Sequence, residues 1–66
     1  MQVTVNDANH ELPDGATVQD LIAALALSGK RVAIEVNRTL IPRANHPQHL
    51  LHPGDHIEVV TLVGGG

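Results

Sequence analysis

The residues with the clearest chemical potential are the three glycines at the end of the sequence, Gly64, Gly65 and Gly66. They follow an apolar run from Ile57 to Val63, and we expect them to form a tail and not to join two structured elements as a turn would. A segment without Cβ atoms can thread a narrow channel and present the carboxylate of Gly66 to another protein's active site. The alternative is a frayed chain end, because termini are poorly ordered by default.

A second candidate group consists of four histidines close together in the sequence, His46, His49, His52 and His56. Imidazole is a common metal ligand. However, two prolines between these histidines interrupt any helix that would align them, and the chain has no cysteine to complete a zinc site. We therefore predict no metal site and expect the histidines in a solvated loop.

No other side chains have the pattern of catalytic residues. Glu11 and Asp14 flank a predicted turn, Asp20 fits the role of a helix cap, and the sequence assigns no base to Ser28. We therefore predict no catalytic residues in this chain. Arg43 either bridges a surface carboxylate or contacts a partner, and the sequence does not separate these roles.

Composition narrows the class of protein further. The 66 residues suit one domain, and the core must be built from Val, Ile, Leu and Ala because no aromatic residue is present. Four basic residues, a net charge of −3 and the lack of aromatic side chains argue against nucleic-acid binding. No apolar run approaches the roughly 20 residues that span a bilayer, so we expect no membrane segment. The absence of cysteine fits the reducing cytoplasm.

Hydrophobic periodicity predicts how the elements position the C-terminal glycines. Alternating residues indicate strands, and Val18, Leu21, Ile22 and Leu25 have helical spacing, with Thr17 as N-cap and Gly29 as the stop. The expected elements are strands at 2–6 and 10–12, a helix at 18–27, and strands at 31–37, 40–42 and 56–62, with one helical turn at most between 43 and 51. One amphipathic helix needs one sheet face to cover. We therefore predict an α+β fold of the β-grasp (ubiquitin-like) type, with four to five strands in a mixed sheet and one main helix on one face.

The predicted register divides the sheet residues between two faces. The face toward the helix would form a core of Val3, Val5, Val18, Leu21, Ile22, Leu25, Val32, Ile34, Val36, Leu51, Ile57 and Val59. The opposite face would carry Ala33, Glu35, Val60 and Leu62 beside the glycines. We interpret this outer face as a docking surface, because the centre of a protein interface is typically apolar. Scattered exposed apolar residues are the alternative.

Three stretches of this sequence together carry a family resemblance. They are Val32 to Asn37 with Leu40-Ile41-Pro42-Arg43, then Leu51 to Val60 with Pro53-Gly54-Asp55, then the terminal glycines. In this combination, and over its whole length, the chain resembles the ThiS-type sulfur carrier proteins of thiamin thiazole biosynthesis. The resemblance implies a β-grasp domain at 1–62 and a flexible glycine tail at 63–66.

The resemblance also implies a function and partners. An E1-like adenylyltransferase (ThiF-type) would use ATP to adenylate the carboxylate of Gly66, with Gly64 and Gly65 threading its active site. Sulfur from a cysteine desulfurase relay would then give a thiocarboxylate for a thiazole synthase (ThiG-type). The chain would be a monomer when free, with no stably bound cofactor, and a substrate of its partners rather than an enzyme.

Two other functions remain open from the sequence. One is a carrier of the same chemistry for molybdopterin or another pathway (MoaD-like). The other is a non-covalent β-grasp interaction module, which does not need a free glycine terminus.

Overall fold

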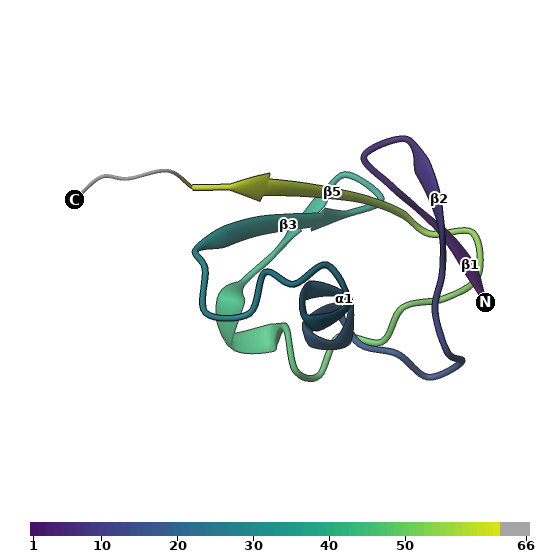
Figure 1. The fold of residues 1–66 in the computed structure, drawn as a ribbon, viewed down its shortest axis with the longest axis horizontal. Helices are drawn as coiled ribbons and strands as arrows, with labels where there is room; N and C mark the ends of the chain where they lie inside the picture. The colour runs from purple at the N-terminus through teal and green to yellow at the C-terminus, as the bar shows by residue number, and fades with distance from the viewer. Residues whose placement is uncertain (63–66) are drawn as a thin grey trace.

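A computed structural model describes residues 1–62 of the chain. The predicted tail at 63–66, with Gly64, Gly65 and Gly66, lies outside the described residues. A single helix lies across one face of a sheet (Figure 1), which confirms the predicted β-grasp arrangement. The elements in chain order are β1 (Gln2–Val5), β2 (Ala8–Glu11), α1 (Val18–Ala24), β3 (Val32–Val36), β4 (Thr39–Ile41), a 3-10 turn η1 (Arg43–Asn45) and β5 (His56–Thr61).

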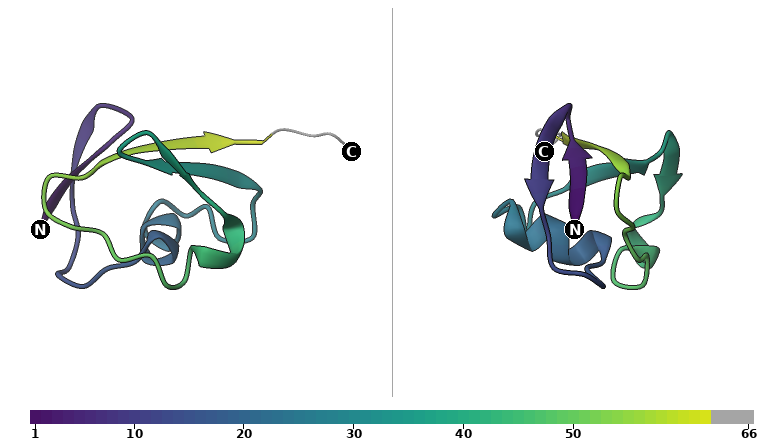
Figure 2. Two further views of the ribbon diagram at one scale, coloured as in Figure 1. Left: turned by 180° about the vertical axis from the view of Figure 1, so that it is seen from behind. Right: turned by 90° about the vertical axis from the view of Figure 1, so that its right-hand side faces the viewer.

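The five strands form one mixed sheet with the order β2-β1-β5-β3-β4, so the last strand in sequence lies at the centre. β5 runs parallel to β1, with Thr4 opposite His56, and antiparallel to β3, with Val32 opposite Thr61. Two further views, from behind and from the right-hand side of Figure 1, both show the helix below the sheet (Figure 2). β1 and β5 therefore both lie inside the sheet.

The sheet contains two β-hairpins, and a tight turn joins the two strands of each. Asn6 and Asp7 join β1 to β2 with φ of 49° and 68°, and Asn37 and Arg38 join β3 to β4 with φ of 50° and 69°. Two successive residues of positive φ are typical of the type I′ turn, whose twist suits a β-hairpin. The first turn is therefore shorter than predicted, and β2 begins at Ala8 rather than at residue 10. Both Asn residues belong to the turns that the sequences Asn6 to Asn9 and Asn37 to Thr39 indicate, so the preceding strands each end one residue earlier than predicted.

The side chains of these two asparagines bind the central strand. The Asn6 amide donates to the Val59 carbonyl at 3.1 Å and accepts from the Val59 amide at 2.9 Å. The Asn37 carbonyl oxygen accepts from the His56 amide at 2.9 Å, and its NH₂ group donates to Asp55 at 3.0 Å. Each hairpin turn thus holds one side of β5, which fixes the strand that precedes the terminal glycines.

The helix begins as the sequence predicts, and its first amides are all satisfied. Thr17 accepts from the Asp20 amide at 3.2 Å, and the Asp20 carboxylate accepts from the Thr17 amide at 2.9 Å, which completes a capping box. The first two helical amides, of Val18 and Gln19, donate to the carbonyls of His49 and His46, each at 3.0 Å. The segment after η1 is therefore tied to the start of the helix.

The helix ends one turn earlier than predicted. It stops at Ala24, and Ala26 takes the left-handed conformation with φ of 60°. The Leu27 amide then bonds to the Ile22 carbonyl and the Ala26 amide to the Ala23 carbonyl, both at 3.0 Å, which is the Schellman pattern. Gly29 is not the helix stop, because its φ of 83° belongs to the following turn closed from Lys30 to Leu27. Because glycine is the usual residue at this position, the alanine there gave no sequence signal for the end of the helix.

The core lies between the helix and the sheet. Most predicted core residues are buried, whereas Leu25, Val32 and Val59 are only partly buried at its margin. Leu12, Ala16 and Ile41 are also buried and were not predicted. Leu12 and Ala16 flank the Pro13 turn, and Ile41 lies in edge strand β4, where periodicity over so few residues is weak.

Other boundaries differ by a residue or two. β4 covers residues 39–41 instead of 40–42 because Pro42 has no amide to pair, and β5 ends at Thr61 instead of Leu62. The helical turn foreseen between 43 and 51 is the 3-10 turn at Arg43–Asn45.

Ala26→Gly is expected to raise the free energy of unfolding by about 1 kcal/mol, because the left-handed conformation strains any residue with a Cβ. Urea denaturation followed by circular dichroism measures this change. Ala24→Gly, in the last helical position, is the matched control and should instead lower stability by about 0.5–1 kcal/mol. A loss of stability in both variants would contradict the assigned helix end.

Asn6→Gly keeps the positive φ of the turn but removes two hydrogen bonds to Val59, so stability should fall by about 1–2 kcal/mol. The Val59 amide should also exchange with deuterium faster than in the parent protein. Asp7→Gly is the control, because the Asp7 side chain makes no hydrogen bond or ion pair within residues 1–62 and its φ also suits glycine. Equal effects of the two substitutions would show that the Asn6 side chain does not hold β5.

Candidate functional site

The outer face of the sheet carries exposed apolar side chains beside the end of β5. Val60 lies opposite Ala33 on β3, and Leu62 directly follows the strand. Val60 and Leu62 are 56% and 51% exposed, although a valine or leucine gains stability when it is buried. The four predicted docking residues therefore lie on neighbouring strands or just beyond them, with Ala33 and Glu35 only partly exposed.

One residue on the outer face of the sheet was not predicted from the sequence. Leu40 on β4 lies opposite Glu35 and is 62% exposed, the highest value among the large apolar side chains of the described chain. Its neighbour Ile41 is buried, so the two leave β4 on opposite faces. That alternation is the signal that would have placed Leu40 outside. We call Ala33, Glu35, Leu40, Val60 and Leu62 the outer patch.

The outer patch contains one carboxylate and adjoins a second. Glu35 on β3 pairs in register with Glu58 on β5. Like charges directly opposite each other on a sheet are destabilising. This cross-strand pair gives the patch a local negative charge beside its apolar residues.

β5 also positions Leu62, the last residue that the structure describes. β1 pairs only with His56 and Ile57, so the final residues of β5 pair with β3 alone. The Leu62 amide donates to the Arg31 carbonyl at 2.8 Å, which extends that pairing by one step. Leu62 is thus held beside the start of β3, while residues 63–66 lie outside the described residues.

The four histidines do not come together, and the expected solvated loop is wrong for one of them. His46 is 6% exposed, and its Nε2 atom lies 3.0 Å from the Ile41 carbonyl. That carbonyl only accepts, so Nε2 carries the proton. His52 and His56 are exposed and His49 is intermediate. Within residues 1–62, no three histidine, aspartate or glutamate side chains are arranged to hold a metal ion.

The carboxylates considered for catalysis have structural contacts. Glu11 and Asp14 lie 2.8 and 3.4 Å from the amino group of Met1. The hydrogen bond that this amino group donates to Glu11 is the main reason that its pKa is raised above its ordinary value. Asp20 caps the helix, and Asp55 accepts from the His52 amide at 2.8 Å. These contacts explain the positions of these side chains without a catalytic role.

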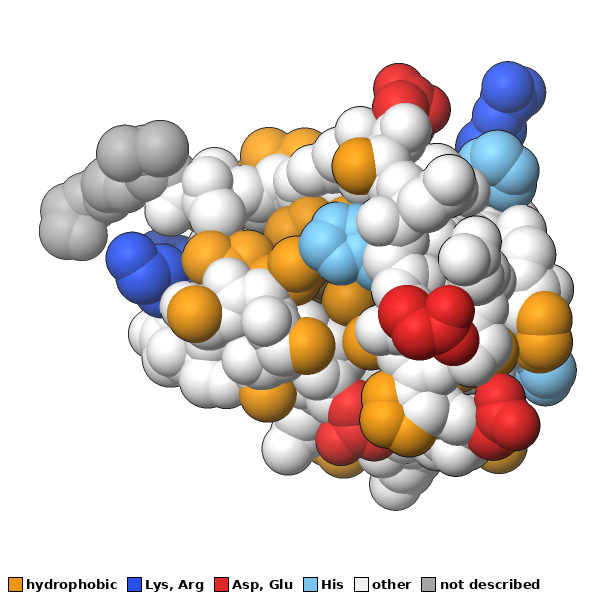
Figure 3. Space-filling model, turned by 45° about the vertical axis from the view of Figure 1, so that its right-hand side comes forward, with side chains coloured by type: hydrophobic (Ala, Val, Ile, Leu, Met, Phe, Trp, Pro, Cys, Tyr) orange, Lys and Arg blue, Asp and Glu red, His pale blue; other side chains and the backbone are white. Residues whose placement is uncertain are grey.

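The space-filling view shows no continuous band of basic side chains on the face it presents (Figure 3). Lysine and arginine appear at two separate edges of that face, and the acidic side chains are spread between and below them. In the part of the chain described, no helix is both long and apolar enough to cross a membrane.

Comparison with known proteins identifies relatives over the whole chain. Residues 2–66 match the model of the ThiS family. The sulfur carrier protein ThiS of Escherichia coli is 30% identical over 66 residues, which is the full length of both chains. A thiazole synthase of Paramagnetospirillum magneticum is 29% identical over the whole of this chain, which spans only 20% of that protein's length.

A solved structure is also similar in fold. The crystal structure of the thiamine biosynthesis protein ThiS from Geobacter metallireducens superposes with a TM-score of 0.84 at 26% identity, and the match covers 100% of both chains. The sequence match over residues 2–66 and this common β-grasp fold agree, and the chain belongs to the ThiS family.

Proposed function

We propose that this protein carries sulfur for thiazole synthesis as a thiocarboxylate on Gly66. The observation that carries the proposal is the ThiS family match, which extends through the terminal glycines to residue 66. The E. coli relative of equal length, named a sulfur carrier protein, supports the chemistry. The thiazole synthase relative supports the pathway, because a ThiS-like segment within such a protein associates the two activities.

The proposed chemistry follows from the reactivity of a carboxylate. A carboxylate is a poor acyl donor, because its leaving group would be oxide. Attack of the Gly66 carboxylate on the α-phosphorus of ATP forms an acyl adenylate and releases pyrophosphate. Sulfide-level sulfur then attacks the carbonyl carbon, AMP leaves, and a thiocarboxylate remains. The carrier itself supplies no catalytic group, and stabilisation of the developing charge comes from cationic groups and magnesium in the partner.

Three partners follow from this scheme. An E1-like adenylyltransferase binds ATP and receives the glycines, a cysteine desulfurase relay supplies sulfur, and a ThiG-type thiazole synthase accepts it. The proposed setting is the cytoplasm, where ATP and these enzymes are available. The free carrier is proposed to be a monomer.

The outer patch is the proposed docking surface for the adenylating partner. It adjoins the end of β5, so a partner bound there receives the glycines that follow. Val60 and Leu62 give it an exposed apolar surface on the β5 side, and the Glu35–Glu58 pair beside them favours a partner with a basic side chain at that position. Partner binding would neutralise two carboxylates that repel each other in the free protein.

The carrier function predicts a gain in mass. Incubation with the cognate adenylating enzyme, ATP and sulfide should raise the mass of the protein by about 16 Da, because sulfur replaces one oxygen after acyl activation. Intact-protein mass spectrometry measures this gain. A chain ending at Leu62 is the matched control and should not change.

The same experiment separates the rival functions. A non-covalent interaction module would bind its partner with no change in mass. A carrier for another pathway would gain the mass but fail to support thiazole formation with thiazole synthase. If the full chain stays unmodified while a known carrier is converted in parallel, the sulfur carrier function is wrong.

Val60→Arg should weaken binding to the adenylating enzyme at least about ten-fold, since it places a charge at the apolar centre of the interface. Calorimetric titration measures the affinity, and circular dichroism checks that the variant is folded. Leu50→Arg is the matched control, because Leu50 is 52% exposed and lies outside the outer patch. Its backbone pairs with Thr17 at the start of the helix. Equal affinities of the two variants would exclude the outer patch as the docking surface.

A further inference from the structure

A cavity of about 320 Å³ lies between the helix and η1, away from the outer patch. Its walls include Gln19 of α1, the turn after the helix, and Arg43 and His46. Two apolar side chains, Ile22 and Val32, contribute to its surface. The carrier chemistry at Gly66 uses none of these residues, so the cavity requires a separate explanation.

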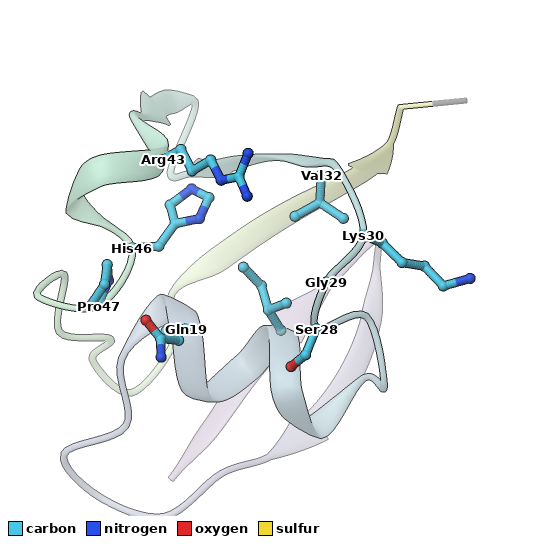
Figure 4. A pocket seen from close by; sticks show the side chains of 9 residues that line it. Gln19, Ser28, Gly29, Lys30, Val32, Arg43, His46 and Pro47 are labelled. Carbon is cyan, nitrogen blue, oxygen red and sulfur yellow. The ribbon is translucent and has the colours of Figure 1, made fainter. Parts of the chain in front are cut away.

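The cavity collects positive charge in an acidic protein. The chain has a net charge of −3 and only four basic residues, yet Lys30 and Arg43 both line this cavity, and no carboxylate side chain does. Within residues 1–62, Arg43 makes no ion pair and no side-chain hydrogen bond. The close view shows Arg43 and His46 together on one side of the cavity, while the Lys30 side chain extends outward (Figure 4). Arg43 is therefore the main cation available to a bound group.

The cavity is held in shape by hydrogen bonds between its walls. The Gln19 amide donates to the His46 carbonyl at 3.0 Å, which joins the helix to the opposite wall. The His46 ring is buried, and Nε2 donates to the Ile41 carbonyl at 3.0 Å. Because these contacts exist in the free chain, a ligand would meet a site that is already formed.

The turn after the helix forms a further part of the cavity wall. Ser28 and Gly29 line the cavity, and their amides have no acceptor within residues 1–62. The turn that presents them is fixed by the bond from the Lys30 amide to the Leu27 carbonyl at 3.0 Å. Peptide amides and a guanidinium group are the donors that bind phosphate oxygens in proteins.

We propose that this cavity binds the phosphate group of a small phosphate monoester. Arg43 would bind two phosphate oxygens, the amides of Ser28 and Gly29 would contact the third, and Lys30 would add charge from the rim. The apolar surface of Ile22 and Val32 gives the organic part of the ester a place to pack. Arg43 is solvent-exposed, so binding is weak, with a dissociation constant of about 1 mM.

The direct test is an NMR titration of the ¹⁵N-labelled full chain at constant ionic strength. Inorganic phosphate and glycerol phosphate are the two probes, and sodium chloride replaces them in the reference titration. Saturable shifts are expected at the amides of Ser28 and Gly29 and at the Arg43 side chain. Tighter binding of glycerol phosphate would show that the organic part of the ester also contacts the cavity, whereas equal binding would assign the site to the phosphate group alone.

Arg43→Gln should weaken both probes about ten-fold, which corresponds to the loss of a charge-assisted hydrogen bond. Arg38→Gln is the matched control, because Arg38 is also exposed but lies in the turn between β3 and β4. The affinity of this variant for both probes should equal that of the parent protein. Because Arg43 is exposed, the spectrum of the variant should retain its dispersion. Shifts that do not saturate, or equal affinity in Arg43→Gln and the parent, would overturn the proposal. The titration needs no partner enzyme, so its result is independent of the sulfur carrier function.

Discussion

The arrangement depends on the pairing of β5 with strands from both halves of the chain. β5 is the last strand in sequence and the central strand in space, parallel to β1 and antiparallel to β3. Its backbone is bound at one side by Asn6 and at the other by Asn37. Formation of this strand therefore requires both hairpins. The position of Leu62, the last described residue, is consequently set by the whole domain.

A core without aromatic residues limits how stable this arrangement can be. Leu21, Ile34 and Ile57 are among the largest fully buried side chains, and each buries less surface than a phenylalanine would. A chain of this size leaves about 40% of its unfolded surface exposed to solvent. Local hydrogen bonds such as the capping box at Thr17 and the asparagine contacts to β5 therefore carry a large share of the specificity. The outer patch does not add to the stability of the free protein, because its apolar side chains are exposed and its carboxylates repel each other.

The sequence predicted the layers well, because periodicity reports which face each residue occupies. Val18, Leu21 and Ile22 identified the helix, and alternation in β3 and β5 placed Val60 outside the core. Local exceptions were missed where residue type and conformation disagree, as at Ala26 in a left-handed conformation. Burial of His46 and the grouping of Arg43 with Lys30 depend on the path of the chain after β4, which carries no periodic signal. The glycines were recognised by composition, which requires no knowledge of the fold.

We propose that the chemistry of this protein occurs at Gly66 and that the domain serves to present it. The measurement that tests the claim most directly is fragmentation of the intact, sulfur-loaded protein in a mass spectrometer. The account predicts that the whole gain of about 16 Da lies in C-terminal fragments that contain Gly66. A gain found in fragments from residues 1–62, or none in the C-terminal fragments, would contradict it.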